Sequence, residues 1–256
     1  MRLNERRTLI GLFIAGVAGA ILFMPAVYFL GLWLAPPRPV PVTSHVPPLL
    51  GDAIWARADG GRATELQPIN PLSFARMRVC RALAAQTDDV TRRAERRAEC
   101  MKILPAIQAA DYLSGVHIRD EHADSGGFRE GISQFATAAW LTRSWTKAEL
   151  VDTLAARGEF GFRWRGAHAA ARGYFARDVG ELTLSQAALL AGLLGDRRAD
   201  PWCDAGAAAS IRHRILERMR DNLAIDDTAF STADRERIEL GSPPADHQPC
   251  RADVRY

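Results

Sequence analysis

The sequence predicts an all-α domain behind a single N-terminal transmembrane helix. From Leu49 onward, apolar residues recur every three or four positions, which is the period of amphipathic helices. Two apolar runs follow capping boxes, at Thr146–Glu149 and Thr183–Gln186. Alternation with a period of two, the signature of strands, is nearly absent. A chain of 256 residues with 48% hydrophobic content is large enough to bury a core.

The N-terminus predicts a membrane anchor. Thr8–Leu34 is a run of 27 residues without a charged side chain, and Arg2, Arg6 and Arg7 precede it. As a helix this run is roughly 40 Å long, against a hydrocarbon core of about 30 Å. Basic residues stay in the cytoplasm, so residues 1–7 form a cytoplasmic tail and the remainder is periplasmic. A cleaved signal peptide is the alternative, but the apolar run is about twice as long as a typical signal core.

A proline-rich segment separates the anchor from the domain. The prolines within residues 35–48 exclude a helix and favour a stiff, extended linker that lifts the domain at residues 49–256 off the bilayer. The net charge of +3 comes from 33 basic and 30 acidic residues that are interleaved along the chain. This pattern argues against a nucleic-acid partner, which needs a concentrated basic face.

Four cysteines follow the apolar run, namely Cys80, Cys100, Cys203 and Cys250. In a translocated domain they can form two disulfides, with three connectivities. Proximity in the sequence favours Cys80–Cys100 with Cys203–Cys250. The spacing argues against a zinc site, because no pair is as close as C-x-x-C.

The region from Trp145 to Leu194 combines two capped apolar helices with a glycine- and aromatic-rich crossing between them. Its characteristic segments, with the helix that follows, are Lys147–Asp152, Phe160-Gly161, Gly166, Ala169–Ala171, Tyr174-Phe175, Leu184–Gly192 and Ile211–Met219. Together they resemble, over about 75 residues, the C-terminal half of the family 51 peptidoglycan glycosyltransferases, which polymerise lipid II. The resemblance implies a lysozyme-like helical domain at a bacterial inner membrane. It also implies lipid II or a glycan strand as ligand and cell-wall synthesis proteins as partners.

The motifs that carry the family's chemistry are altered in this chain. The family's Glu-Asp-x-x-Phe-x-x-His motif has only a faint counterpart in Ala109-Ala110-Asp111 followed by His117. Its Gly-x-Ser-Thr-Ile-Thr-Gln-Gln motif has a faint counterpart in Gly131–Gln134. A second, ungapped alignment instead puts Gln134 at the second glutamate of the family's Arg-Lys-x-x-Glu motif, with a segment missing between Asp124 and Glu130. Glutamine cannot ionise as glutamate does.

Polymerisation needs a carboxylate base and cationic groups for the leaving pyrophosphate. We expect the base to be Glu121 or Asp111. The substrate-binding candidates are Arg163, Arg165, Lys147 and Gln134. Arg163 and Arg165 flank Trp164, so the alternative is that they are surface arginines packed on an indole.

The polar run from His117 to His122 fits neither zincin spacing, and its simpler interpretation is a polar helix end. No metal site is therefore predicted from the residues. The resemblance does admit a divalent cation at the pyrophosphate, and it implies no other cofactor.

Two functions follow from these observations. The first is a reduced but active membrane-anchored glycosyltransferase, and the second is a non-catalytic descendant that binds glycan or a cell-wall protein. A soluble lytic transglycosylase is a third, which the anchor disfavours. A carboxylate of Glu121 or Asp111 in a groove beside Arg163 and Arg165 would favour the enzyme.

Overall fold

The structure is a computed structural model that describes residues 25–63, 65–70, 76, 79–80, 82–86, 92, 96, 99–100, 107–121, 127–161, 163–197, 199–247 and 250. Helices dominate these residues, so the all-α prediction is confirmed. The α-helices are α2 (Pro48–Arg57), α5 (Ile107–Glu121), α6 (Phe128–Ser144), α7 (Lys147–Arg157), α8 (Ala167–Phe175), α9 (Leu184–Leu193), α10 (Ala205–Asp221) and α11 (Asp227–Arg235). The short elements are the 3₁₀ helix η1 (Val179–Glu181) and the strands β1 (Glu159–Phe160) and β2 (Trp164–Arg165).

Helix α9 forms the centre of the core. Every residue from Ser185 to Leu193 is buried, and α2, α8 and α10 pack around the helix. Its capping box is present: the Thr183 side chain accepts from Gln186 N, and the Gln186 side chain accepts from Thr183 N. Thr146 and Glu149 form the same arrangement at the start of α7. These two caps begin the helices where the sequence predicts.

The crossing between α7 and α8 is a small antiparallel hairpin. Strand β1 pairs with β2, and Phe160 also bridges to Leu194 after α9. Gly161 has φ 66°, and a Cβ placed there would lie 2.1 Å from the Tyr174 hydroxyl oxygen. Only glycine fits this turn, because of both the close contact and the left-handed backbone. The hairpin is therefore seated tightly on α8 and α9.

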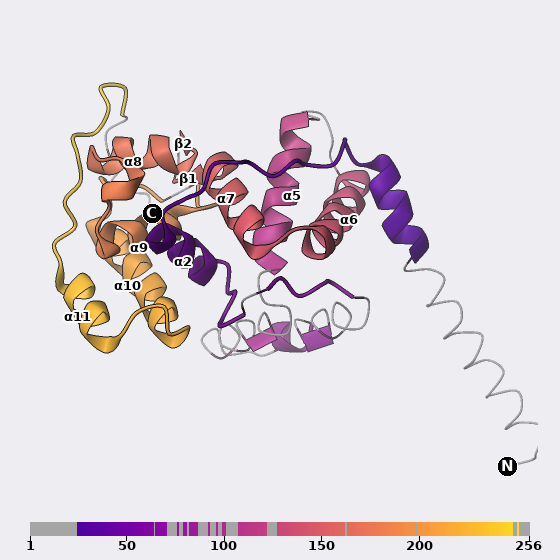
Figure 1. Ribbon diagram of the computed structural model, residues 1–256, viewed down its shortest axis with the longest axis horizontal. Coiled ribbons are helices and arrows are strands. Elements are labelled where there is room, and N and C mark those ends of the chain that lie inside the picture. The colour runs from indigo at the N-terminus through magenta and orange to yellow at the C-terminus, as the bar shows by residue number, and fades with distance from the viewer. Residues whose placement is uncertain are drawn as a thin grey trace, which may run out of the picture.

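Helices α5 and α6 pack against each other beside this core, and α5 also contacts α7 (Figure 1). Residues 25–34 form a further helix on the far side of α6 (Figure 1). Gly31 lies at that crossing, where an added Cβ would be 2.6 Å from the Ala136 Cβ. The absence of a side chain at Gly31 thus allows the two helices to approach closely.

The proline-rich segment is extended, as expected, but it is fastened to the domain instead of standing free. Its Pro37 carbonyl is 2.7 Å from His117 Nε2 on α5. The Val42 N–H donates to Thr153 Oγ1 and the Val46 N–H donates to an oxygen of Asp152, both on α7. The segment runs from the helix at residues 25–34 past α5 and α7 to α2 (Figure 1). The prediction of a stiff, extended linker did not include these contacts, because the groups that make them lie about 80 to 110 residues away in the sequence.

Most of the predicted membrane span, Thr8–Leu34, lies outside the described residues, which include only positions 25–34 of it. Among the helices that the structure describes, none combines the length and the hydropathy needed to cross a bilayer.

The cysteines pair as Cys80–Cys100 and Cys203–Cys250, the connectivity that sequence proximity favours. Their Cα atoms are 5.6 Å and 5.2 Å apart, respectively. These separations lie within the usual range for disulfides. The second bridge joins the start of α10 to the C-terminal segment that follows α11.

Candidate functional site

A cavity of about 230 Å³ lies between α2, α5 and the turn that follows α9. We call it the Asp111 cavity, because Asp111 is one of its walls and is a candidate base. Apolar atoms come from Leu154 and Leu194. The remaining lining residues are Arg57, Ala58, Gln108, Ala109, Tyr112 and Gly195. The cavity therefore combines a carboxylate, a guanidinium, an amide and a phenol with an apolar wall.

The polar groups of the Asp111 cavity are held in place by neighbouring elements. Gln108 Nε2 donates to Asp59 Oδ2 at 2.8 Å, which fixes the side-chain amide. The Tyr112 hydroxyl accepts from the Glu159 N–H at 2.9 Å. Burial raises the pKa of the Tyr112 phenol, so the hydroxyl keeps its proton at neutral pH and remains a hydrogen-bond donor.

Glu121, the other candidate base, is exposed at the last residue of α5. It is ten residues from Asp111, which corresponds to about 15 Å along a helix. Glu121 does not line the Asp111 cavity. The two candidate carboxylates are therefore not brought together in one site.

The arginines of the crossing are engaged by carboxylates of the chain itself. Arg163 donates to both oxygens of Asp246, at 2.9 Å and 2.7 Å, and stacks over Trp164 at 5.3 Å. Arg165 pairs with Asp120 at the end of α5. These hydrogen bonds raise the pKa of both guanidinium groups. Neither arginine lines the Asp111 cavity, so Asp111 and these two arginines do not share that cavity.

The other two substrate-binding candidates make contacts between helices. The Gln134 side chain reaches across from α6, where its Nε2 donates to the Asp111 carbonyl oxygen at 3.1 Å. The Lys147 ammonium lies 4.7 Å from the centre of the Trp55 ring, so it forms a cation–π contact with α2. Gln134 thus lies next to the residue suspected as base, whereas Lys147 serves packing.

No carboxylate occupies the two positions where the family motifs have glutamates. In register with Asp111 and His117, the leading glutamate of the first motif falls on Ala110, which is 0% exposed and belongs to the core. The second position is Gln134. A third difference is Asp152, which replaces a family glutamate on α7. Its buried carboxylate accepts from the Val46 N–H at 3.0 Å and lies 2.6 Å from His45 Nδ1, so it holds the proline-rich segment.

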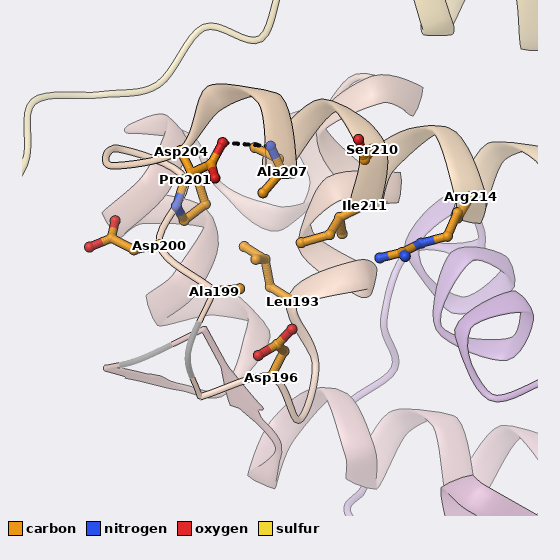
Figure 2. Close-up of a pocket in the computed structure, with 11 residues that line it drawn as sticks. Leu193, Asp196, Ala199, Asp200, Pro201, Asp204, Ala207, Ser210, Ile211 and Arg214 are labelled. Carbon is orange, nitrogen blue, oxygen red and sulfur yellow. Dashed lines mark hydrogen bonds between the residues drawn. The ribbon is translucent and has the colours of Figure 1, made fainter. Parts of the chain in front are cut away.

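A second cavity, of about 220 Å³, lies on the other side of the turn after α9, between that turn and α10 (Figure 2). Three aspartates and Arg214 contribute its charged groups. Asp204 Oδ1 accepts from the Ala207 N–H at 2.7 Å and caps α10 (Figure 2). Asp200 is 2.9 Å from His247 Nε2 of the C-terminal segment.

Asp200, Cys203 and His247 are the one group in the described part of the chain with three potential metal-ligating atoms within 4.8 Å of one another. Cys203 is bonded to Cys250, however, and a disulfide sulfur is not the thiolate that binds metals. We interpret the group as a hydrogen-bonded pair, Asp200 and His247, beside a disulfide.

Sequence reasoning found Asp111 but missed Arg57, Gln108 and Tyr112 as its neighbours. Gln108 and Tyr112 had a signal, since Gln108 lies three residues before Asp111 and four before Tyr112, and residues at these spacings share a helix face. Arg57 had none, because the packing of α2 against the rest of the fold brings it to α5.

Comparison with known proteins also indicates similarity to transglycosylases. Residues 117–220 match the family model for transglycosylases. Penicillin-binding protein 1A of Vibrio cholerae serotype O1 (strain ATCC 39315 / El Tor Inaba N16961) is 28% identical over 122 residues, which is 44% of this chain but 15% of that protein. The crystal structure of penicillin-binding protein 1A from Haemophilus influenzae, at 21% identity, covers 52% of this chain and 17% of that one with a TM-score of 0.36, which supports no structural argument. The chain thus spans a small part of its relatives' length. Residues 117–220 are thus similar to a family 51 transglycosylase domain.

Proposed function

We propose that this protein is a membrane-anchored, transglycosylase-like protein of the bacterial cell wall that binds glycan strands or lipid II without polymerising them. One observation carries the proposal. The two positions that the family motifs assign to glutamates are Ala110, which is buried in the core, and Gln134, which bonds to a backbone carbonyl. Loss of a general base typically lowers a rate by about 10²–10⁴-fold, enough to abolish polymerisation in practice.

The Asp111 cavity supplies the binding chemistry. Sugar hydroxyls both donate and accept, and the cavity offers an acceptor in Asp111 and donors in Arg57 and Tyr112. Leu154 and Leu194 contribute apolar surface for the face of a sugar ring. The volume of about 230 Å³ is below the range of drug-sized pockets, which begins at roughly 300 Å³, and suits a single sugar residue of a longer strand.

The anchored arrangement is part of the proposal. Arg2, Arg6 and Arg7 before the apolar run favour a cytoplasmic N-terminus and a periplasmic domain at an inner membrane. Both disulfides suit an oxidising compartment outside the cytoplasm. Cell-wall synthesis proteins are the partners that this location implies, and a divalent cation at the pyrophosphate of lipid II remains an expectation of the family resemblance.

A reduced but active glycosyltransferase is the second candidate, and the position of Asp111 favours it. This carboxylate lines a cavity, follows the lost glutamate by one residue, and lies beside polar groups that can hold a sugar. Under this alternative Asp111 takes the proton from the attacking hydroxyl, and Glu121 is the less favoured base because it lies outside the cavity.

The decisive experiment gives labelled lipid II to the full-length protein in detergent and measures both binding and polymer formation. We expect saturable binding and no polymer from the wild type. Asp111→Asn should weaken binding, whereas Glu121→Gln, a matched change on the same helix, should leave it unchanged. Polymer formation that Asp111→Asn abolishes would replace the non-catalytic proposal with the second candidate, and failure to bind either lipid II or glycan strands would refute both.

A further inference from the structure

Arg57 is a cation whose charge is only partly compensated, by the nearby carboxylates of Asp59 and Asp196. It lies at the end of α2, is partly buried, and lines the Asp111 cavity. Within the described part of the chain, its guanidinium neither donates a hydrogen bond nor reaches a carboxylate at ion-pair distance. Burial lowers the pKa of Arg57, and the positive charge of Arg218 lowers it further. The folded protein therefore holds this charge at a cost that an added anion would offset.

The carboxylate nearest in sequence is already occupied. Asp59 is 3.0 Å from Arg218 Nη1 and accepts from Gln108 Nε2 at 2.8 Å. Its field partly offsets the desolvation of Arg57 but it forms no pair with Arg57. The donors of Arg57 thus stay available on the side of the cavity.

Arg214 presents a similar group in the second cavity. It is exposed on α10, and its side chain points toward Leu193 and Ile211 (Figure 2). Among the described residues, Arg214 also has no carboxylate at ion-pair distance and no hydrogen-bond acceptor. Arg57 and Arg214 are close enough for the charge of Arg214 to lower the pKa of Arg57.

The two cavities meet at one turn. Leu193 and Asp196 line the second cavity, whereas Leu194 and Gly195, between them in the sequence, line the Asp111 cavity. A ligand that crosses this turn therefore meets Arg57 on one side and Arg214 on the other. Asp196 is close enough to Arg57 to raise its pKa. The other two aspartates of the second cavity are engaged elsewhere, because Asp200 lies 2.9 Å from His247 Nε2 and Asp204 caps α10.

We propose that Arg57 and Arg214 are the two cationic contacts of a sugar ligand that bears oxyanion groups and lies across the Leu193–Asp196 turn. Guanidinium groups match the geometry of carboxylates and phosphates through paired N–H donors. The oxyanions come either from carboxylates along a glycan strand or from the diphosphate of an activated sugar, and both have this chemistry. The inference rests on the proposed glycan-binding function, and it adds that the site prefers anionic sugar ligands to neutral ones.

The test compares three probes on the full-length protein by calorimetry. Peptide-free glycan strands carry a lactyl carboxylate on each repeat, uridine diphosphate N-acetylglucosamine carries a diphosphate, and chitin oligomers are neutral. Arg57→Gln and Arg214→Gln remove one charge each, and Arg177→Gln is the matched control at an exposed site on the loop after α8. Removal of a charge-assisted hydrogen bond should weaken binding of an anionic probe roughly tenfold or more.

Weakened binding of either anionic probe by Arg57→Gln and Arg214→Gln, with chitin affinity unchanged, would support the inference, and the probe affected identifies the oxyanion. Equal losses for chitin and the anionic probes would overturn it, as would unchanged affinity in both variants. In the last case the strands still bind, so the proposed function stands. A wild type that binds none of the probes would refute the proposed function as well. Arg214 is exposed, so its variant answers the question even if Arg57→Gln does not fold.

Discussion

The hairpin-and-α9 half of the domain and the α5–α6 half differ in how closely they match the motifs of the family 51 transglycosylases. In the first half, the two capping boxes begin α7 and α9, the Gly161 turn lets the hairpin pack closely, and α9 is buried in the core. In the second, the helices still pack, but Ala110 and Gln134 stand where the motifs have glutamates. The difference teaches that packing and proton transfer depend on separate residues. The capping boxes, the Gly161 turn and α9 hold the fold without a carboxylate at either motif position.

The largest expected effect concerns the disulfides, of which Cys203–Cys250 lies beside the hairpin-and-α9 half and Cys80–Cys100 lies outside both halves. Cys203–Cys250 closes 47 residues and Cys80–Cys100 closes 20. In the chain-entropy model, replacing each pair by serine should cost about 4 kcal/mol and about 3 kcal/mol, respectively. Urea unfolding of the two double variants measures both costs. A greater loss from the Cys80–Cys100 pair would show that loop length does not decide the contribution of each disulfide.

Restoring the motif carboxylates tests the second half. Ala110→Glu places a carboxylate at a position that is 0% exposed, which should destabilise the fold by roughly 3 kcal/mol. Gln134→Glu should cost less, since that side chain is partly exposed. We expect neither variant, nor the two combined, to polymerise lipid II. Ala205→Glu, at the exposed first residue of α10, is the control and should be nearly neutral. A stable double variant that polymerises would show that only two side chains separate this chain from an enzyme.

A titration at high pH compares a tyrosine from each half. Burial raises the pKa of Tyr174, so its contribution to stability is complete below the ordinary tyrosine pKa and declines as the pH rises above it. The Tyr174 hydroxyl donates to the Phe160 carbonyl at 3.3 Å, and Tyr174→Phe should cost about 1 kcal/mol at neutral pH. The variant should also lose less stability than the wild type above about pH 10. Tyr112→Phe, the control from α5, should change this alkaline loss less. Identical curves of unfolding free energy against pH for Tyr174→Phe and the wild type would exclude Tyr174 as the source of the alkaline loss of stability.

The smallest effect concerns the C-terminal segment. The hydrogen bond from Arg163 lowers the pKa of the exposed Asp246 carboxyl. The Asp246–Arg163 contact should therefore persist below the ordinary aspartate range and break only as the pH falls through the lowered value. An NMR titration of the Asp246 carboxyl measures this directly. Asp246→Asn should shift the unfolding midpoint least of all these variants, and an Asp246 that titrates at the ordinary value would show that the contact does not form in solution.

Local sequence features predicted much of the fold. The helical periodicity, the caps at Thr146 and Thr183 and the cysteine pairing all depend on residues close in sequence, and the structure contains all three. The segment at residues 35–48 was predicted to be extended because proline fixes its backbone, which is again a local effect. Its last residue, Pro48, instead begins α2, since proline fits the first turn of a helix.

The candidate site was less predictable, because its contacts depend on packing. Arg163 and Asp246 are separated by 83 residues, and Tyr112 meets Glu159 across 47. No spacing rule relates such positions. Sequence reasoning therefore identified Asp111 from a motif, but it could not place Arg57 beside Asp111 or see that Arg163 and Arg165 already have acidic partners.

The fastened proline-rich segment has a mechanical consequence. It is held at three points, by His117 on α5 and by Thr153 and Asp152 on α7, and the preceding helix crosses α6 closely at Gly31. A free tether would absorb a displacement of the helix at residues 25–34 before the domain moved. Here a tilt of that helix is passed directly to α5, α6 and α7. The helix and the domain therefore turn together, and the angle of the helix at residues 25–34 sets the direction in which the Asp111 cavity faces.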